Sequence, residues 1–246
     1  MKHVTITMLV FILVCLFSGA CDDNGSDGTT DPVDPPTGVA LIYHSDSAWV
    51  ADWAALLTAN DFAATRLSTT DVSTADLSGF DVLFVESRTG NVGDWYGDST
   101  AVENIRNSGK PILAAGFGGA CLLWEMGDYD HNWMNGANLS DTTGTSDQAC
   151  HIKVMAPDLP IFTTPIPFHI PADSIIEVYT QTALIEQYAP ETGDTTLLLG
   201  QDVVNNSYYP LTAEGNTVLW GFTNGPDRMT RTGKDLIVNI VKHLAE

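Results

Sequence analysis

The chain has 246 residues, of which 31 are acidic and 10 are Lys or Arg, so its formal net charge is −21 at pH 7. So acidic a surface repels nucleic acid, whose binding depends on Lys and Arg at the phosphates, and nucleic-acid binding is therefore excluded. The hydrophobic content of 44% is ordinary and supports a sizeable core in one large domain or two small ones.

The N-terminus has the build of an export signal. A basic start at residues 2–3 and an apolar run over 4–17 precede small residues at 18–20 and then Cys21. The run is shorter than the roughly 20 apolar residues that a helix needs to cross a bilayer core. The segment 18–21 resembles the lipobox of bacterial lipoproteins, although Ser18 stands where Leu is commonest. Its small residues would also suit the ordinary signal peptidase, so plain secretion remains an alternative.

The lipobox resemblance implies that residues 1–20 are a signal peptide and that Cys21 carries lipid, palmitate included. The protein would then be anchored to a membrane of the cell envelope, facing the periplasm or the cell exterior. Residues 21–37 would be the lipidated Cys and a disordered tether, because Asp, Gly, Thr and Pro dominate there without apolar periodicity. The folded domain is predicted to span 38–246.

Strands and helices alternate in the first half of this domain. Short apolar runs predict buried strands at 39–43, 63–67, 81–85 and 111–115. Apolar spacing and capping residues predict helices at 45–61, 99–107 and 120–126. This alternation indicates an α/β fold whose mainly parallel sheet is covered by helices on both faces.

The second half of the domain is richer in strands. Strands are predicted at 152–155, 175–180, 183–188, 195–199 and 216–222. An amphipathic helix over 230–245 closes the chain. Two loops rich in Gly, Asp and Asn, at 91–98 and 127–147, interrupt the pattern, and a loop as long as the second is usually functional or mobile.

Polar and small residues follow four of the predicted strands, at 43–46, 86–88, 116–119 and 223–225. Ligands of open α/β sheets bind beyond the carboxyl ends of the strands, so these residues are expected to line a ligand site. The expected ligand-binding residues are His44, Asp46, Glu86, Arg88, Phe117 and Gly118.

His44 and Glu86 are the best candidates for acid–base chemistry, because each follows a predicted buried strand. Arg88 could simply pair with Glu86, and His44 could equally be a packed or solvated side chain. The sequence therefore leaves the catalytic residues open.

No metal site or cofactor is predicted. The chain has no HExxH spacing and no CxxC, which leaves a zinc site unsupported. Oxygen ligands at alternate positions of 128–132 are typical of the start of a calcium loop, but Trp133 occupies the place of the required Gly. The glycines of 116–119 could cradle a phosphate, yet GxGxxG and the P-loop Lys are missing, so a tight turn is favoured.

Two cysteines, Cys121 and Cys150, belong to the predicted domain. Two thiols outside the cytoplasm tend to pair, so a disulfide is expected between them. Such a bond closes a loop of about 30 residues and would stabilise the fold by roughly 3–4 kcal/mol. The alternative is a lone, reactive Cys121.

Residues 109–127, GKPILAAGFGGACLLWEMG, resemble the strand, sharp turn and helix of class I glutamine amidotransferase-like domains. Relatives of these domains include the intracellular-protease-like and trehalose-utilisation-like families. The order of elements over 38–127 and the closing strand and helix also agree. The resemblance implies a flavodoxin-like fold over most of 38–246.

The same resemblance implies a nucleophilic Cys at the turn, two residues after a Gly. Aligning that Gly with Gly116 puts Gly118 in the place of the nucleophile, and the loop 223–228 contains no His. Amidotransferase chemistry is therefore expected to be absent. The alternative is a shifted turn with Cys121 as the nucleophile.

These observations favour a lipid-anchored extracytoplasmic domain that binds a ligand or an envelope partner without catalysis. One alternative is a hydrolase of carbohydrate or peptide that uses His44 and Glu86 as acid and base. Another is a structural envelope protein, which would need neither residue.

Overall fold

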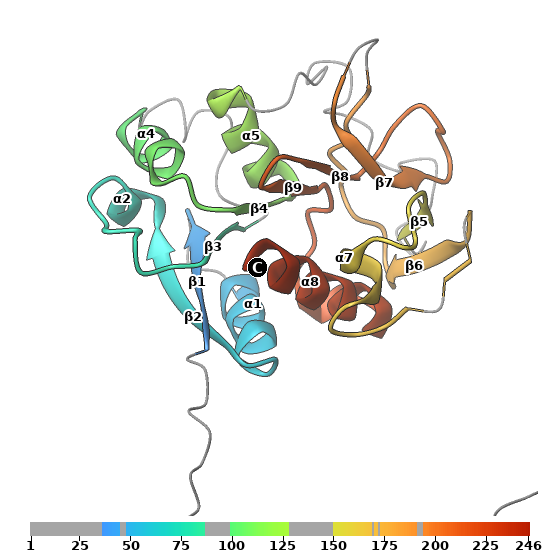
Figure 1. The fold of residues 1–246 in the computed structure, drawn as a ribbon, viewed down its shortest axis with the longest axis horizontal. Coiled ribbons are helices and arrows are strands. Elements are labelled where there is room, and N and C mark those ends of the chain that lie inside the picture. Colours follow the sequence, from blue (N-terminus) through green and yellow to red (C-terminus); the bar gives the residue numbers. More distant parts are fainter. Residues whose placement is uncertain are drawn as a thin grey trace, which may run out of the picture. The chain divides into compact units, whose positions relative to one another are not determined.

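In the computed structural model of the protein, the described residues form a sheet of nine strands in the order β2-β1-β3-β4-β9-β8-β7-β5-β6 (Figure 1). Neighbouring strands are parallel from β2 to β9 and antiparallel from β9 to β6. The strands are β1 (Thr37–Tyr43), β2 (Phe62–Ser68), β3 (Val82–Val85), β4 (Ile112–Ala115), β5 (Cys150–Val154), β6 (Ile175–Tyr179), β7 (Leu197–Asp202), β8 (Leu211–Glu214) and β9 (Thr217–Trp220).

The structure describes residues 36–44, 48–86, 99–127, 150–168, 170–171, 173–190 and 194–246. The predicted signal and most of the tether, both long loops, and the site candidates Asp46 and Arg88 lie outside these residues, apart from Gly127 at the start of the second loop. Residues 36–246 form one compact unit. Within the described part of the chain, no helix is long and apolar enough to cross a membrane.

Helices cover both faces of the sheet, as predicted. Six helices and a 3-10 turn are described: α1 (Ala48–Thr58), α2 (Thr69–Val72), α4 (Ser99–Ser108), α5 (Gly116–Met126), α7 (Pro160–Thr163), α8 (Arg231–Leu244) and η1 (Pro226–Arg228). The core forms two clusters, one including α1, α7 and α8 and the other including α2, α4 and α5.

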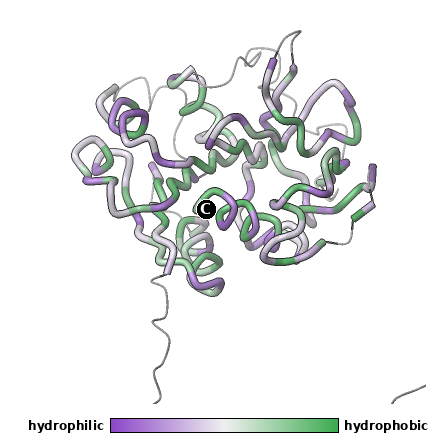
Figure 2. The backbone as a smooth tube through the Cα atoms, in the orientation of Figure 1, coloured by the Kyte–Doolittle hydropathy of each residue, from purple (hydrophilic) through white to green (hydrophobic). Residues whose placement is uncertain are grey.

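The central strands are buried on both faces because their side chains alternate between the two clusters. In β1, Val39 and Leu41 belong to the α8 cluster, whereas Ala40 and Ile42 belong to the α5 cluster. Figure 2 shows the resulting hydrophobic stretches through the middle of the sheet. Strands buried in this way read as continuous apolar runs, which is why the sequence predicted them well.

The structure differs from the predicted elements in several places. The predicted strand at 183–188 is wrong, because this segment contributes only isolated bridges, at Ile185 and Tyr188. Strand β8 was not predicted. The helix expected to begin at residue 120 begins at Gly116, because the chain turns into it directly from β4.

The predicted disulfide is also wrong. Cys121 and Cys150 are both buried and not bonded to each other. Cys121 packs in the α5 cluster and Cys150 in the α8 cluster, so they belong to opposite faces of the sheet. The Cys150 thiol donates to the carbonyl of Gln181 (3.3 Å) and accepts from the backbone N–H of Ala183 (3.2 Å).

Candidate functional site

The carboxyl ends of β1, β3, β4 and β9 meet at one edge of the sheet. Their registers pair Ile42 with Val85, Val85 with Ala114, and Ala115 with Trp220. The residues that follow these strands are therefore neighbours at this edge, which we call the strand-end site. It contains four of the predicted site residues within the described chain, namely His44, Glu86, Phe117 and Gly118.

The turn from β4 into α5 is made by Gly116. Its φ is +48°, in the left-handed region that glycine adopts at little cost. In enzymes with a nucleophile elbow, the nucleophilic residue lies at a sharp strand-to-helix turn of this kind. The turn residue is therefore Gly116 and not Gly118, which lies within the first turn of α5. The predicted alignment was displaced by two residues because the helix begins earlier than expected.

Small residues around this turn let α5 pack closely against β4. A Cβ added to Gly119 would lie 2.4 Å from the carbonyl carbon of Ala114. Cys121 follows in the second turn of the helix, where only 2% of its surface is exposed. It therefore does not occupy the position at which the strand turns into the helix.

Glu86 directly follows β3 and is completely buried. Its backbone N–H donates to the carbonyl of Ile42 over 2.9 Å, which extends the pairing of β3 with β1 by one residue. The sequence thus predicted the place of this carboxyl group correctly.

His44 is exposed at the end of β1. Its Nδ1 lies 3.4 Å from the hydroxyl of Thr69, which follows β2. Since β1 lies between β2 and β3, this contact is on the opposite side of β1 from Glu86. The two predicted acid–base candidates therefore follow adjacent strands, but the described hydrogen bond of His44 is directed away from Glu86.

Residues 183–188, which we call the strap, lie beside the residues that continue β9 beyond this edge of the sheet. The backbone N–H of Glu186 donates to the carbonyl of Gly221 (2.7 Å), just beyond β9, and Thr223 donates to Leu184 (3.0 Å). At its other end, the strap exchanges two hydrogen bonds with Tyr209, ahead of β8. The strap thus runs antiparallel beside the chain that continues β9.

Glu186 is a functional candidate that the sequence did not reveal. Only 4% of its surface is exposed, and this burial raises the pKa of its carboxyl group to about 7. The only signal in the sequence was an acidic residue inside an apolar segment, and this pattern is equally typical of a half-exposed strand. Such shifted carboxyl groups are frequent at functional sites.

A buried polar network fixes the loop that follows β9. The Trp220 indole N–H donates to the Tyr179 hydroxyl (3.0 Å), which donates to the carbonyl of Asn224 (3.0 Å). The Asn224 side chain in turn donates to the carbonyl of Thr182 (3.1 Å), which ties the loop to the residue ahead of the strap. Gly225 packs against the ring of Trp49 on α1.

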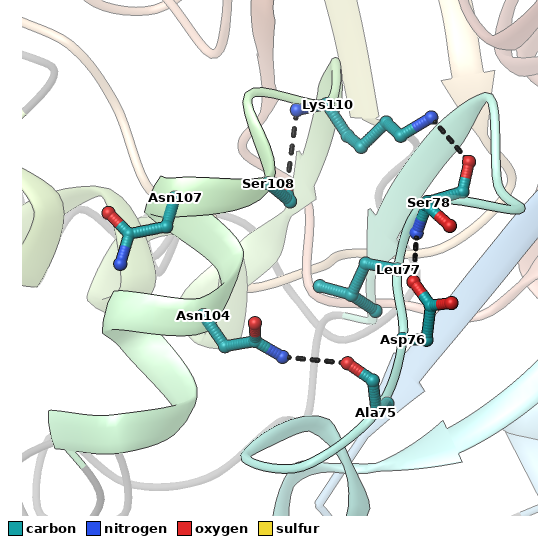
Figure 3. A pocket seen from close by; sticks show the side chains of 8 residues that line it. All are labelled: Ala75, Asp76, Leu77, Ser78, Asn104, Asn107, Ser108 and Lys110. Carbon is teal, nitrogen blue, oxygen red and sulfur yellow. Dashed lines mark hydrogen bonds between the residues drawn. The ribbon is translucent and has the colours of Figure 1, made fainter.

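A hollow of about 290 Å³ opens at the opposite edge of the sheet, ahead of β3 and β4 (Figure 3). Several of the polar groups that line it already bond to one another or to backbone. Asn104 donates to the carbonyls of Val72 and Ala75, and Lys110 donates to the carbonyl of Ser78. These bonds hold α4 to the segment before β3, so a structural role explains this hollow.

Among the residues that the structure describes, no group of three His, Cys, Asp or Glu side chains could hold a metal ion.

No protein-family model matches the sequence, and no curated protein matches it either. Solved structures are similar in fold. A protein of Thermoplasma acidophilum assigned to GMP synthase has a TM-score of 0.59 at 13% identity, over 85% of this chain and 94% of its own. A protein of Bacteroides uniformis named ThuA-like has a TM-score of 0.56 at 13% identity, over 88% and 94% of the two chains.

A glutamine amidotransferase of Thermotoga maritima is similar as well, with a TM-score of 0.52 at 10% identity, over 85% of this chain and 98% of its own. Likenesses at these identities show the fold alone. The protein thus has the amidotransferase-like, flavodoxin-type α/β fold that the segment 109–127 predicted.

Proposed function

We propose that this protein is a lipid-anchored extracytoplasmic domain that binds a ligand or partner at its strand-end site without catalysing a reaction. The observation that carries the proposal is the glycine at the turn between β4 and α5. Gly116 stands where an elbow nucleophile would be, and it has no side chain with which to attack a substrate. In addition, the loop 223–228 contains no His, which supports the absence of catalysis.

The membrane anchor rests on the N-terminal sequence. The apolar run over 4–17 and the small residues before Cys21 support export and lipidation. Metabolic labelling with a palmitate analogue is expected to mark the parent protein and not Cys21→Ser. An unlabelled but secreted parent would support plain secretion, and the strand-end site would be unaffected.

Ligand binding is tested by thermal unfolding of the purified protein with sugars, cell-wall fragments, nucleotides and divalent metals. A ligand at about 100 times its Kd stabilises a fold by about 2.7 kcal/mol, which is readily measured. We expect at least one stabilising compound, and we expect Glu86→Gln to reduce its effect. Turnover of that compound would contradict the proposal, as would a complete absence of hits.

A hydrolase remains the second candidate, because Glu86 is fully buried at a strand end beside that of His44. An enzyme of this kind would lose turnover in His44→Ala and in Glu86→Gln while keeping its thermal stability. If no compound binds, a structural envelope role becomes the better explanation. Its mark would be a cross-linked partner that both variants retain.

A further inference from the structure

Arg228 ends the 3-10 turn η1 in the chain that follows β9, and 42% of its side chain is exposed. Within the part of the chain that the structure describes, its guanidinium group makes no hydrogen bond. Its Nε lies 3.7 Å from Oδ2 of the neighbouring Asp227, which is beyond hydrogen-bond distance. The N–H donors of Arg228 are therefore available to a partner.

The ring of Trp49 holds this guanidinium group in place. Cζ of Arg228 lies over the indole, 5.9 Å from the ring centroid, which is a cation–π contact. Gly225 packs closely on the same ring, because a Cβ added there would lie 2.7 Å from Cγ of Trp49. The backbone is fixed as well, since the carbonyl of Arg228 accepts from the N–H (2.9 Å) and the hydroxyl (3.0 Å) of Thr180. An arginine held in this way loses less conformational entropy when it binds a ligand.

The pair formed by Trp49 and Arg228 borders the strand-end site. Trp49 is the second residue of α1, the helix that follows β1, whereas η1 follows β9. In the sheet, β1 and β9 are the outer two of the four strands whose carboxyl ends define the site. A contact between the segments that follow these two strands therefore bounds the site on the face of the sheet that carries α1.

The charge of the chain decides which anion suits this place. With 31 acidic residues against 10 Lys and Arg, the protein repels anions, so a bound anionic group needs a cation in direct contact. A guanidinium group presents parallel N–H donors that match the two oxygens of a carboxylate. A carboxylate also carries a single charge, which one arginine balances. A phosphate monoester carries about two charges, and Asp227 would oppose the second.

We propose that Arg228, held by Trp49, binds the carboxylate group of the ligand at the strand-end site. The inference rests on the proposed function as a ligand-binding domain and names the chemical class of its ligand. Arg228 donates two charge-assisted hydrogen bonds to the carboxylate. Trp49 is a positioning residue, because it fixes the guanidinium group and does not itself donate to the anion.

The test uses N-acetylglycine as the probe, with its amide as the neutral counterpart and methyl phosphate as an anion of higher charge. Affinity is measured by NMR titration of the purified protein at neutral pH, at a constant ionic strength because the chain is strongly acidic. The acid should bind about tenfold more tightly than the amide, because hydrogen bonds between charged groups are about twice as strong as neutral ones. Methyl phosphate should bind more weakly than the acid.

Variants separate the role of Arg228 from that of net charge. Arg228→Gln should lose about tenfold in affinity for the acid and keep the affinity for the amide. Arg228→Lys keeps the charge without the parallel donors and should lie between that variant and the parent. The matched control is Arg231→Gln, which changes the charge equally at an exposed arginine bonded to Asp235, and it should behave as the parent. Trp49→Leu should reduce the preference for the acid over the amide.

Equal binding of the acid and its amide, tighter binding of methyl phosphate, or no binding of N-acetylglycine would overturn the inference. So would an equal loss in Arg231→Gln and Arg228→Gln, and these two variants still decide the matter if Trp49→Leu does not fold. A compound of the thermal screen that depends on Glu86 but not on Arg228 would overturn the inference and leave the proposed function intact. Turnover at the site would instead refute the proposed function itself.

Discussion

The parallel and the antiparallel halves of the sheet differ in how deeply their strands are buried and in how these strands are connected. In the parallel half, β1, β3, β4 and β9 are buried on both faces, and helices connect most successive strands. In the antiparallel half, only the short helix α7 stands between described strands, and the outermost strand, β6, exposes Ile175 and Glu177. The parallel half therefore forms the buried centre of the fold.

The functional consequence of this difference lies at the shared edge of the sheet. The parallel half supplies the strand ends, with Glu86 and the Gly116 turn. The chain of the antiparallel half supplies the strap, whose Glu186 is bonded through its backbone to Gly221 just beyond β9. The two halves of the sheet thus both contribute residues near the ends of the parallel strands.

The largest effect is expected in the parallel half, from Gly119→Ala. The added Cβ would lie 2.4 Å from the backbone of Ala114, so α5 must move away from β4. The better helix propensity of Ala does not offset such a clash, and we expect a loss of about 3 kcal/mol or more in the free energy of unfolding. Urea denaturation measures this loss.

The matched control for that substitution is Gly79→Ala, at a turn where nothing lies within 4 Å of the added atom. It should change stability by no more than about 0.5 kcal/mol. Equal effects of the two substitutions would mean that the close approach of α5 to β4 does not stabilise the parallel half.

The buried Glu186 of the strap should make the free energy of unfolding depend on pH. The pKa of Glu186 is raised from 4.5 to about 7, so the folded state holds this proton more tightly than the unfolded chain does. Its stabilising contribution is complete below pH 4.5 and is lost as the pH rises through 7. Glu186→Gln should therefore match the parent at pH 4 and exceed it at pH 9 by on the order of 3 kcal/mol.

Urea denaturation from pH 4 to pH 9 checks this difference, with Glu103→Gln as the exposed control. A constant difference between Glu186→Gln and the parent across this range would show that Glu186 is ionised without cost. The strap would then be an ordinary surface segment.

The smallest of the three effects is expected where the halves are joined. Tyr179→Phe removes the hydroxyl that links Trp220 on β9 to the carbonyl of Asn224. Two buried polar groups lose their partner, so we expect a loss of about 2 kcal/mol by urea denaturation. Tyr208→Phe, at a half-buried tyrosine, should cost no more than about 0.5 kcal/mol.

A loss in Tyr179→Phe as small as that of the control would mean that water replaces the hydroxyl. In that case the network would not hold the loop after β9.

The success of the sequence predictions followed the same division between the halves. The strands of the parallel half were placed within a few residues, because continuous apolar runs are typical of strands buried on both faces. In the other half β8 was missed, since LTAE is too short and too mixed in character to predict a strand. The segment 183–188 has strand-like composition but pairs only at isolated points.

The residues of the candidate site also differ in how well the sequence predicted them. Glu86 and His44 could be placed because they directly follow predicted strands, and the glycine turn was recognised, although two residues out of register. The disulfide between Cys121 and Cys150 could not be judged, because no sequence pattern reveals that the sheet separates the two thiols. Glu186 was missed because its burial depends on contacts between segments distant in the sequence.

The sequence by itself determined the α/β alternation, the buried strands of the parallel half and the acids that follow them, since these depend on local hydrophobic patterns. Only the tertiary structure decided which residue makes the turn into α5, which thiols can meet and where the strap pairs beyond β9. Those features depend on backbone dihedral angles and on long-range packing. Neither property leaves a periodic signal in the chain.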